Sequence, residues 1–516
     1  MVKKTTKAQG KSSYGGSQDN TPIPHASSST ANKPTKRSVN ATKARALRLK
    51  NRGVKKKTKP TIRRYRRPTV NKWDLVKCSA CQAIVWNAEA VTQGTRNSPK
   101  MFSICCQQGR VKLPPRRAPP SPLKEILDKP SFRPLIRVAN GMLAFTSMGG
   151  QIDRTVTGTP GPFTLRLHGQ NCHQIGSLLP GDGKLPRYLQ LYIVDTENEL
   201  ENRKKAFSQG ASPVDIDDDL IAELIKMMDE HNHLAKTFRH ARNRIVSGES
   251  VEFSVTLVSQ RQRGRQYDLP SADEIGGLLV GDLTENSAGK DIVVEFRSSK
   301  LQRISDLHPM YMSLQYPLLF PYGEYSYDEK IPYFVTENSK IKRECMTMRE
   351  FYAYQLQTRP TEGMTIIKSG RLLNQYIVDA YTATEQERLR FIRLNQKKLR
   401  GELYTNVCDA FDSGDTDAAQ LGKKVILPSS FTGGPRYMSE KYEDAMAISR
   451  WYGNPNLFIT FTANPNWVEL KEHLEAYGGD SSNSRPDLEC RVFKLKLDEM
   501  MADFKKGVYF PKPAAG

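Results

Sequence analysis

The stretch Lys77–Trp86 (KCSACQAIVW) contains two cysteines separated by two residues, Cys78 and Cys81. A second pair, Cys105 and Cys106, follows after 23 intervening residues. A Cys-x-x-Cys turn lets two thiolates face one tetrahedral metal ion, and a second pair of cysteines completes a structural zinc site. Cys105 and Cys106 fit a shared metal site less well than Cys78 and Cys81, because neighbouring side chains of a strand point to opposite faces. We predict a structural Zn²⁺ ion held by these four thiolates, with free buried thiols as the alternative.

The other cysteines of the chain stand alone. The sequence contains eight cysteines, and those outside the cluster are Cys172, Cys345, Cys408 and Cys490, which we expect in the core. No apolar run approaches the roughly 18 residues of a membrane span, so we expect no membrane partner. The polar start of the chain lacks the apolar stretch of a secretory signal. We therefore expect reduced thiols or metal ligands rather than disulfides.

The positive charge of the protein is concentrated at its start. The formal net charge is +23, with 78 Lys and Arg against 55 Asp and Glu. Residues 1–70 contain 20 of these basic residues and a single acid, Asp19, so they alone carry +19. Cationic segments bind polyanions by releasing the counterions condensed on phosphates. We expect this segment to contact nucleic acid or to act as a nuclear import signal, and a solvated non-specific tail is the simpler alternative.

Two dense basic runs within this tail are the expected sites of phosphate contact. The residues that we expect to bind nucleic acid are Lys55, Lys56, Lys57, Arg63, Arg64, Arg66 and Arg67.

Composition divides the chain into five parts of an α+β protein. Residues 1–72 are rich in Ser, Thr, Lys, Gly and Pro, and we predict a disordered basic tail. The cysteine cluster defines a small zinc-knuckle-like module over 73–112, and seven prolines predict an extended linker over 113–136. Residues 137–345 are expected to form a mixed α/β body, and residues 346–516 are expected to form a separate C-terminal domain.

Hydrophobic periodicity and capping signals predict individual elements. Strands are expected at residues 188–194, 251–258, 291–296 and 457–462. Helices are expected at residues 217–242, 438–451 and 486–505, and capping boxes at Thr347 and Thr384 predict the starts of two more. The aromatic and proline-rich residues 307–327 predict an ordered, non-helical loop, in which packing is favoured over stacking on bases.

Motifs for nucleotide hydrolysis and for common hydrolytic chemistry are absent from the sequence. It contains no Gly-x-x-x-x-Gly-Lys-Ser/Thr, no Gly-x-Ser-x-Gly and no His-Glu-x-x-His. His231-Asn232-His233 is expected within a helix, where side chains two positions apart diverge, so we expect a structural or solvent-facing role. His168, Cys172 and His173 are expected in a polar turn beside a strand rather than at a metal. We therefore expect that the chain is not itself an enzyme.

A series of longer stretches carries a family resemblance. These are Lys77–Trp86, Cys105–Pro114 (CCQQGRVKLP), Leu167–Leu179 (LHGQNCHQIGSLL), Gln190–Arg203 (QLYIVDTENELENR), Gly264–Asp282 (GRQYDLPSADEIGGLLVGD), His308–Gly323 (HPMYMSLQYPLLFPYG), Arg349–Arg359 (REFYAYQLQTR), Gln375–Gln396 and Leu427–Leu470. In this order they resemble the N-terminal half of Helitron transposon proteins, which carry a rolling-circle replication endonuclease followed by a helicase. The resemblance extends from about Trp73 to Phe504.

The resemblance implies that Phe458–Trp467 is the first motif of the replication-initiator nuclease, a strand and turn within an incomplete replication-initiator-like sheet. The metal-binding His-hydrophobic-His motif and the nucleophilic tyrosines of the family have no counterpart here, so no catalytic residue is carried over. Residues 505–516 (KKGVYFPKPAAG) depart from the family pattern, which favours a truncated chain.

Three functions remain open from this resemblance. The first is a nuclear, DNA-associated fragment of a Helitron transposase, which would bind single-stranded DNA or transposon ends, with a full-length transposase as a possible partner. The second is part of an active single-stranded DNA nicking endonuclease, completed by downstream sequence or by a partner chain. The third is a non-functional transposon relic.

Overall fold

The computed structural model describes most of the chain after its basic tail. The described residues are 71–92, 99–152, 155, 167–208, 216–248, 253–257, 276–279, 292–298, 300–334, 343–396, 426–479 and 484–511. The predicted nucleic-acid contacts at residues 55–67 and the thiol of Cys408 lie outside them. Among the described helices, none is long and apolar enough to cross a membrane.

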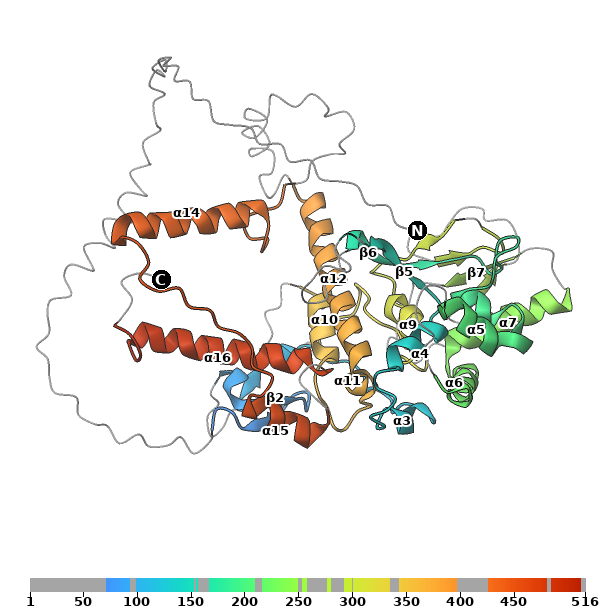
Figure 1. The fold of residues 1–516 in the computed structure, drawn as a ribbon, viewed down its shortest axis with the longest axis horizontal. Coiled ribbons are helices and arrows are strands. Elements are labelled where there is room, and N and C mark those ends of the chain that lie inside the picture. Colours follow the sequence, from blue (N-terminus) through green and yellow to red (C-terminus); the bar gives the residue numbers. More distant parts are fainter. Residues whose placement is uncertain are drawn as a thin grey trace, which may run out of the picture. The chain divides into compact units, whose positions relative to one another are not determined.

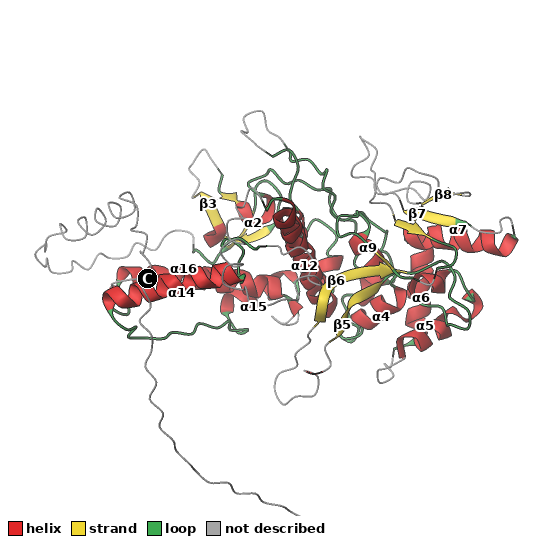
Figure 2. Cartoon of the chain, turned by 90° about the horizontal axis from the view of Figure 1, so that it is seen from above, coloured by secondary structure: helices red, strands yellow, loops and turns green. Residues whose placement is uncertain are grey.

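The described residues form four small antiparallel sheets, and helices pack around them (Figure 1). The strands are β1 (Leu75–Lys77), β2 (Ile84–Trp86), β3 (Ala90–Thr92), β4 (Met101–Phe102), β5 (Ser147–Ile152), β6 (Leu167–Ile175), β7 (Ser254–Leu257), β8 (Gly276–Leu279), β9 (Ile292–Val294) and β10 (Gln302–Arg303). The sheet orders are β1-β2, β3-β4, β10-β6-β5 and β8-β7-β9. Figure 2 shows β5 and β6 side by side, paired from Ser147 opposite Gln174 to Ile152 opposite Leu167. This mixture of helices and small sheets confirms the coarse fold class expected from the sequence.

Helices make up the larger share of the described chain. They are α2 (Ser103–Cys106), α3 (Leu123–Ile126), α4 (Ile136–Leu143), α5 (Glu199–Ser208), α6 (Asp218–His231), α7 (His233–Ser247), α9 (Tyr311–Gln315), α10 (Met348–Gln355), α11 (Thr365–Lys368), α12 (Arg371–Leu394), α14 (Pro435–Tyr452), α15 (Val468–Tyr477) and α16 (Pro486–Lys506), with 3-10 turns η1 (Asn87–Glu89), η3 (Tyr188–Tyr192) and η4 (Thr196–Asn198). The predicted helices at 438–451 and 486–505, and the helix starting at Thr347, correspond to α14, α16 and α10.

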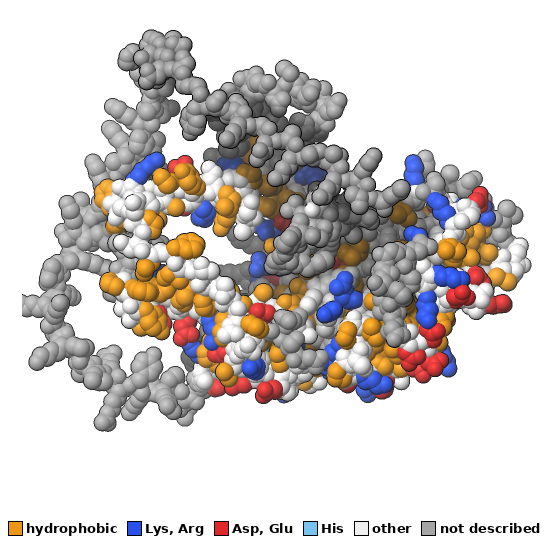
Figure 3. Space-filling view, viewed as in Figure 1, with side chains coloured by type: hydrophobic (Ala, Val, Ile, Leu, Met, Phe, Trp, Pro, Cys, Tyr) orange, Lys and Arg blue, Asp and Glu red, His pale blue; other side chains and the backbone are white. Residues whose placement is uncertain are grey.

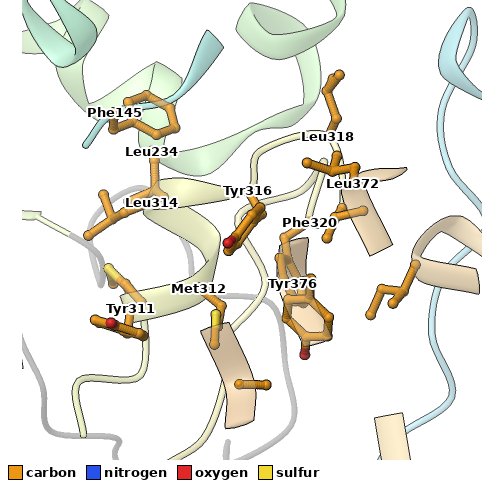
Figure 4. Packing of buried hydrophobic residues seen from close by; sticks show 14 of the residues in the cluster. Phe145, Leu234, Tyr311, Met312, Leu314, Tyr316, Leu318, Phe320, Leu372 and Tyr376 are labelled. Atoms are coloured by element: carbon orange, nitrogen blue, oxygen red, sulfur yellow. The ribbon is translucent and has the colours of Figure 1, made fainter. Parts of the chain in front are cut away.

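The main hydrophobic core is centred on the aromatic segment that includes α9. Tyr316 and Leu318 are fully buried, and Phe320 is nearly so. Figure 4 shows these side chains with Leu372 and Tyr376 of α12, and the rings of Tyr316 and Tyr376 meet edge to face with centroids 5.8 Å apart. Packing rather than base stacking is therefore the role of this segment. The segment was expected to be non-helical, but residues 311–315 form the short helix α9.

The predicted helix at 217–242 is two helices, α6 and α7, separated at Asn232. The side-chain oxygen of Asn232 accepts hydrogen bonds from the backbone N–H groups of Leu234 (2.9 Å) and Ala235 (3.1 Å). Its amide group donates to the carbonyl of Phe320 at 3.3 Å. Asn232 is thus the N-cap of α7 and is fixed to the aromatic core, so the His-Asn-His sequence marks a helix junction.

Two other predicted elements have different structures. Residues 188–192 form the 3-10 turn η3 rather than a strand, because Tyr188 has a φ of +53° that no strand accommodates. The capping pattern at Thr384 does not start a helix: α12 begins at Arg371, and the hydroxyl of Thr384 donates within it to the carbonyl of Ala380 (2.8 Å).

The proline-rich residues 113–136 were expected to form an extended linker, and instead they pack into the main core. Leu123 and Ile136 are fully buried, and Ile126, Leu127 and Phe132 are nearly so. The carbonyl of Arg116 accepts a hydrogen bond from the N–H of Gly363 (2.8 Å). The apolar residues between the prolines therefore determine the structure of this segment.

The predicted strand at 457–462 is irregular backbone. Phe458 is 95% exposed and Leu457 is 60% exposed. The described residues of 426–511 contain only helices as regular elements, so no strand lies beside this segment to pair with its N–H and C=O groups. Hydrophobic side chains also line α14, none of whose residues is buried, and they are visible along it in Figure 3.

Candidate metal centre

Cys78 and Cys81 lie at the turn that connects β1 to β2. The N–H of Cys78 donates to the carbonyl of Ala83, and the N–H of Gln82 donates to the carbonyl of Cys78, both at 2.9 Å. Gln82 has a φ of +59°, the left-handed conformation that closes a tight turn. The turn brings the two thiols toward a common point.

Cys105 and Cys106 are the last two residues of α2, not residues of a strand. Consecutive side chains of a helix diverge by about 100° instead of the 180° of a strand, so both thiols reach the β1–β2 turn. After α2 the chain reverses through Gln107 and Gln108, which both have positive φ. The N–H of Gly109 then donates to Sγ of Cys106 at 3.2 Å. Because Cys105 and Cys106 lie in a helix and not in a strand, both thiols can face the same metal ion.

The four sulfur atoms have the spacing of a tetrahedral metal site. All four lie within 4.8 Å of one another. The distance from Sγ of Cys106 is 3.8 Å to Cys78 and 3.7 Å to Cys105. Four thiolates at a zinc–sulfur distance of about 2.3 Å form a tetrahedron with edges of about 3.8 Å. The cluster therefore fits a metal ion without rearrangement of the chain.

The hydrogen bonds among the four thiols lower the pKa of Cys78 and Cys81 and raise the pKa of Cys105 and Cys106, so the environment favours the thiolate at two of the four positions. Cys78, Cys105 and Cys106 are buried, and Cys81 is half-buried. Hydrogen bonds from Cys105 and then Cys106 lower the pKa of Cys81 to about 7, and the positive charge of Arg359 adds to this effect. Hydrogen bonds from Cys105 and the other thiols also hold the pKa of Cys78 below its ordinary value. Thiolates are the form of cysteine that binds metal.

Arg359, which the sequence did not single out, supports the cluster from a distant part of the chain. Its Nε donates to the carbonyl of Cys81 (3.0 Å), and its Nη2 lies 3.7 Å from Sγ of Cys81. Its Nη1 donates to the carbonyl of Tyr354 (2.8 Å), whose ring lies under the guanidinium. A divalent ion with four thiolates would carry a net charge of −2, so a buried guanidinium beside it is a favourable partner. No local sequence signal connects residues 278 positions apart.

The β1–β2 hairpin also packs against the C-terminal helices. Trp86, at the end of β2, is fully buried in a second hydrophobic cluster with Leu470 and Leu474 of α15 and Leu488 and Val492 of α16. The fully buried His473 of α15 lies beside Trp86, with ring centroids 5.5 Å apart. Burial, and then the positive charges of Arg485 and Arg491, lower the pKa of His473 to about 3.

Two buried arginines fix this contact. Arg491 donates through Nε and Nη2 to the carboxylate of Glu89 in η1, at 2.8 and 2.6 Å. Arg485 donates through Nη2 to the hydroxyl of Thr358 at 3.2 Å, next to the cluster's partner Arg359. The Arg491–Glu89 pair is buried, so loss of either partner would leave the other charge buried and unpaired. The cysteine cluster, the end of α10 and the C-terminal helices therefore form one continuous contact.

A basic segment, residues 110–117, follows the cluster in the sequence, and charged side chains of this segment lie over aromatic rings. The ammonium group of Lys112 lies 4.9 Å from the ring centroid of Phe334, and the guanidinium of Arg117 lies 4.0 Å from that of Tyr322. Lys112, Arg117 and Phe334 are exposed. Arg116 differs, because it donates to the carbonyls of Gln355 (2.9 Å) and Gln357 (3.2 Å) and so has a structural role.

His173 lies in β6 rather than in a polar turn, and it makes a buried network instead of a metal site. Its Nδ1 is 2.9 Å from the carbonyl of Tyr311, and its Nε2 is 2.5 Å from the carboxylate of Asp379 in α12. The hydroxyl of Tyr316 donates to the same carboxylate at 2.9 Å. Both ring nitrogens are engaged, so the histidine is available neither as a ligand nor as a general base.

The isolated cysteines differ in their environments. Cys172 is buried as expected, and Cys345 is half-buried. Cys490 is exposed on α16, so its expected place in the core is wrong. The inward-facing positions of this helix near it are taken by Leu488 and Val492.

Comparison with known families gives one match. Residues 351–515 match the model of the family described as the Helitron helicase-like domain at the N-terminus. The chain therefore contains a Helitron helicase-like N-terminal domain, which confirms the resemblance over these residues. The match includes residues 505–515, which were expected to depart from the family pattern. Searches of curated proteins and of solved structures gave no match. The matched region begins in α10 and includes Arg359 and the helices α15 and α16 that contact the cysteine hairpin.

Proposed function

We propose that this protein is a DNA-associated component of a Helitron transposon, in which a zinc ion at the four-cysteine cluster organises the scaffold. The observation that carries the proposal is the contact between the cluster and the family-matched region. Arg359 lies within residues 351–515 and binds Cys81 directly. The module and the matched region would therefore act as one unit, and we place that unit in the nucleus, at the DNA.

The chemistry of the cluster favours zinc as the ion. Four sulfur ligands in a tetrahedral arrangement suit Zn²⁺ or an iron–sulfur centre, and the soft, closed site leaves no open position for catalysis. The role of the ion in this proposal is structural. Purified full-length protein should contain one zinc per chain by elemental analysis. Cys78→Ser and Cys106→Ser should each lower this content severalfold, whereas Cys490→Ser, at the exposed cysteine, should leave it unchanged. Full zinc content in the cluster variants would refute the site.

The DNA contact in this proposal comes mainly from the basic tail. Residues 1–70 carry +19, and each phosphate that they neutralise adds about −0.9 to the slope of log affinity against log salt. The basic segment at 110–117 would add contacts near the cluster, where Phe334 offers an exposed ring for unpaired bases.

A charge-neutralised tail tests this proposal in the full chain. Glutamine at residues 55–57, 63, 64, 66 and 67 should weaken binding to single-stranded DNA by roughly tenfold or more near 0.15 M salt and should flatten the salt slope. A variant with the tail residues scrambled but the charge kept is the matched control, and it should bind like the original protein. Equal affinity of the neutralised and original proteins would contradict a tail-driven contact.

A further inference from the structure

We propose that α14 is an interface between two copies of this chain, which pair as antiparallel helices about a twofold axis at Ala445. The helix lies within the family-matched residues 351–515. Neither the cysteine cluster nor the basic tail takes part in this interface, so it is independent of the proposed function.

The described chain gives α14 no packing partner. None of the residues of this 18-residue helix is buried, and hydrophobic side chains are visible along it (Figure 3). Tyr442 is 62% exposed and Trp451 is 77% exposed. Most helices in proteins are stabilised by the packing of an apolar face rather than by intrinsic propensity. A helix with its apolar side chains in solvent therefore requires a partner.

Uncharged side chains form a continuous seam along α14. Its members recur at alternating spacings of four and three residues, and they are Met438, Tyr442, Ala445, Ser449 and Tyr452. This spacing puts them on one side of the helix, as in the seam along which paired helices pack. The α14 seam is thus suited to a second helix.

The α14 seam is complementary to itself. Met438 and Tyr452 each lie seven residues from Ala445, so a twofold axis at Ala445 places Met438 opposite the partner's Tyr452. A methionine adapts its shape to a neighbouring ring. The small side chain of Ala445 lets the two helices approach closely where they cross. One register therefore satisfies both copies.

The charges of α14 suit a second copy and do not suit DNA. The helix carries three basic and three acidic residues, so its formal net charge is zero and it offers phosphates no net attraction. In the Ala445 register, Glu440 lies level with the partner's Arg450, and no charged side chain lies level with one of the same sign. The following residues, 451–468, carry no charge. Two copies can therefore meet without like-charge repulsion.

The exposed apolar area is large enough for a stable pair. Eight large apolar side chains between residues 438 and 459 are 42–95% exposed. Because an aromatic side chain buries about 150–250 Å², together they offer on the order of 800 Å². A stable protein–protein complex buries roughly 800 Å² on each partner, whereas the largest apolar patch of a typical monomer is about 300–600 Å².

Analytical ultracentrifugation of the full-length protein tests the proposal, under reducing conditions, at high salt and after nuclease treatment. The original protein should sediment as a dimer at micromolar concentration. Ala445→Glu puts two like charges at the twofold axis and should raise the dissociation constant of the dimer by about tenfold or more. Ala447→Glu is the matched control, because it adds the same charge at an exposed alanine on the opposite side of α14, and it should remain dimeric.

Cysteine cross-linking gives a second measurement that leaves the interface intact. Helix axes about 8–10 Å apart, with Cα atoms about 2.3 Å from each axis, bring residues on the twofold axis within reach of a disulfide. Ala445→Cys should therefore form a covalent dimer on mild oxidation. Ala447→Cys should not exceed the original protein, in which Cys490 is an exposed thiol.

Several outcomes would overturn the proposal. These are a protein that stays monomeric, equal effects of the two glutamate variants, and equal cross-linking of the two cysteine variants. A monomer in which α14 resists hydrogen exchange would assign the seam to another segment of the same chain, and it would also overturn the proposal. Neutralisation of the basic tail should leave the dimer intact, so this test fails separately from the test of DNA association.

Discussion

Gly363 marks a point where two distant backbone segments meet. Its N–H donates to the carbonyl of Arg116 at 2.8 Å. A Cβ built at Gly363 would lie 1.8 Å from the carbonyl oxygen of Arg117, and backbone atoms cannot move aside as a side chain can. The close approach of residues 113–136 to the family-matched region thus depends on a missing side chain.

Gly363→Ala should therefore destabilise the protein by about 1–3 kcal/mol or more, as overpacking does in tight interiors. Urea unfolding measures this loss. Gly176→Ala is the control, because a Cβ there would meet its nearest atom at an ordinary 3.6 Å. Equal stability of the two variants would show that the backbone of Arg117 lies farther from Gly363 than in the structure.

His473 makes the stability of the C-terminal contact sensitive to acid. Its pKa is about 3 in the folded protein, against 6.5 for an ordinary histidine. Between these values the unfolded chain binds a proton that the folded chain does not. Stability is therefore complete above pH 6.5 and falls as the pH decreases, by up to about 1.4 kcal/mol per pH unit.

His473→Gln should remove this dependence. Urea midpoints at pH 7 and pH 5 should differ more in the original protein than in this variant. His231→Gln, at a partly exposed histidine at the end of α6, should keep the original dependence. An identical decrease of the urea midpoint from pH 7 to pH 5 in all three proteins would show that another group causes the acid sensitivity.

At the scale of elements, Asn232 decides whether residues 218–247 form one helix or two. Asn232→Ala should cost about 1–2 kcal/mol, because it removes the cap of α7 together with the hydrogen bond from the side chain to the carbonyl of Phe320. Asn198→Ala, in the exposed turn η4, should cost much less. Thermal denaturation compares the stabilities of the two variants. Unchanged stability of Asn232→Ala would mean that packing alone separates α6 from α7.

Elements whose signals are local were predicted well, and elements that depend on distant partners were not. The capping box of Thr347 is formed, with the N–H of Glu350 donating to the threonine hydroxyl at 3.3 Å. The same pattern at Thr384 fails because α12 already passes through it. The strand expected at 457–462 fails because strand pairing requires a neighbour, and the described residues provide none.

The candidate metal site could be predicted because its ligands lie close in sequence. The spacing of Cys78, Cys81, Cys105 and Cys106 was sufficient, although their geometry required the helix α2. The sequence could not indicate Arg359, because its contact with Cys81 joins residues 278 positions apart.

At the scale of the whole molecule, the cysteine cluster connects the start of the described chain to its end. The β1–β2 hairpin carries Cys78 and Cys81 between its strands and Trp86 at the end of β2, and Trp86 packs against α15 and α16. If a metal ion fixes the hairpin, then removal of the ion should release the C-terminal helices as well, because binding energy at a structural site is folding energy.

Hydrogen–deuterium exchange of the full-length protein with and without metal chelation tests this coupling most directly. We predict that peptides from β1–β2, α15 and α16 lose protection together when the metal is removed, while those from α6 and α7 keep theirs. Complete metal removal with unchanged exchange in α15 and α16 would contradict the account.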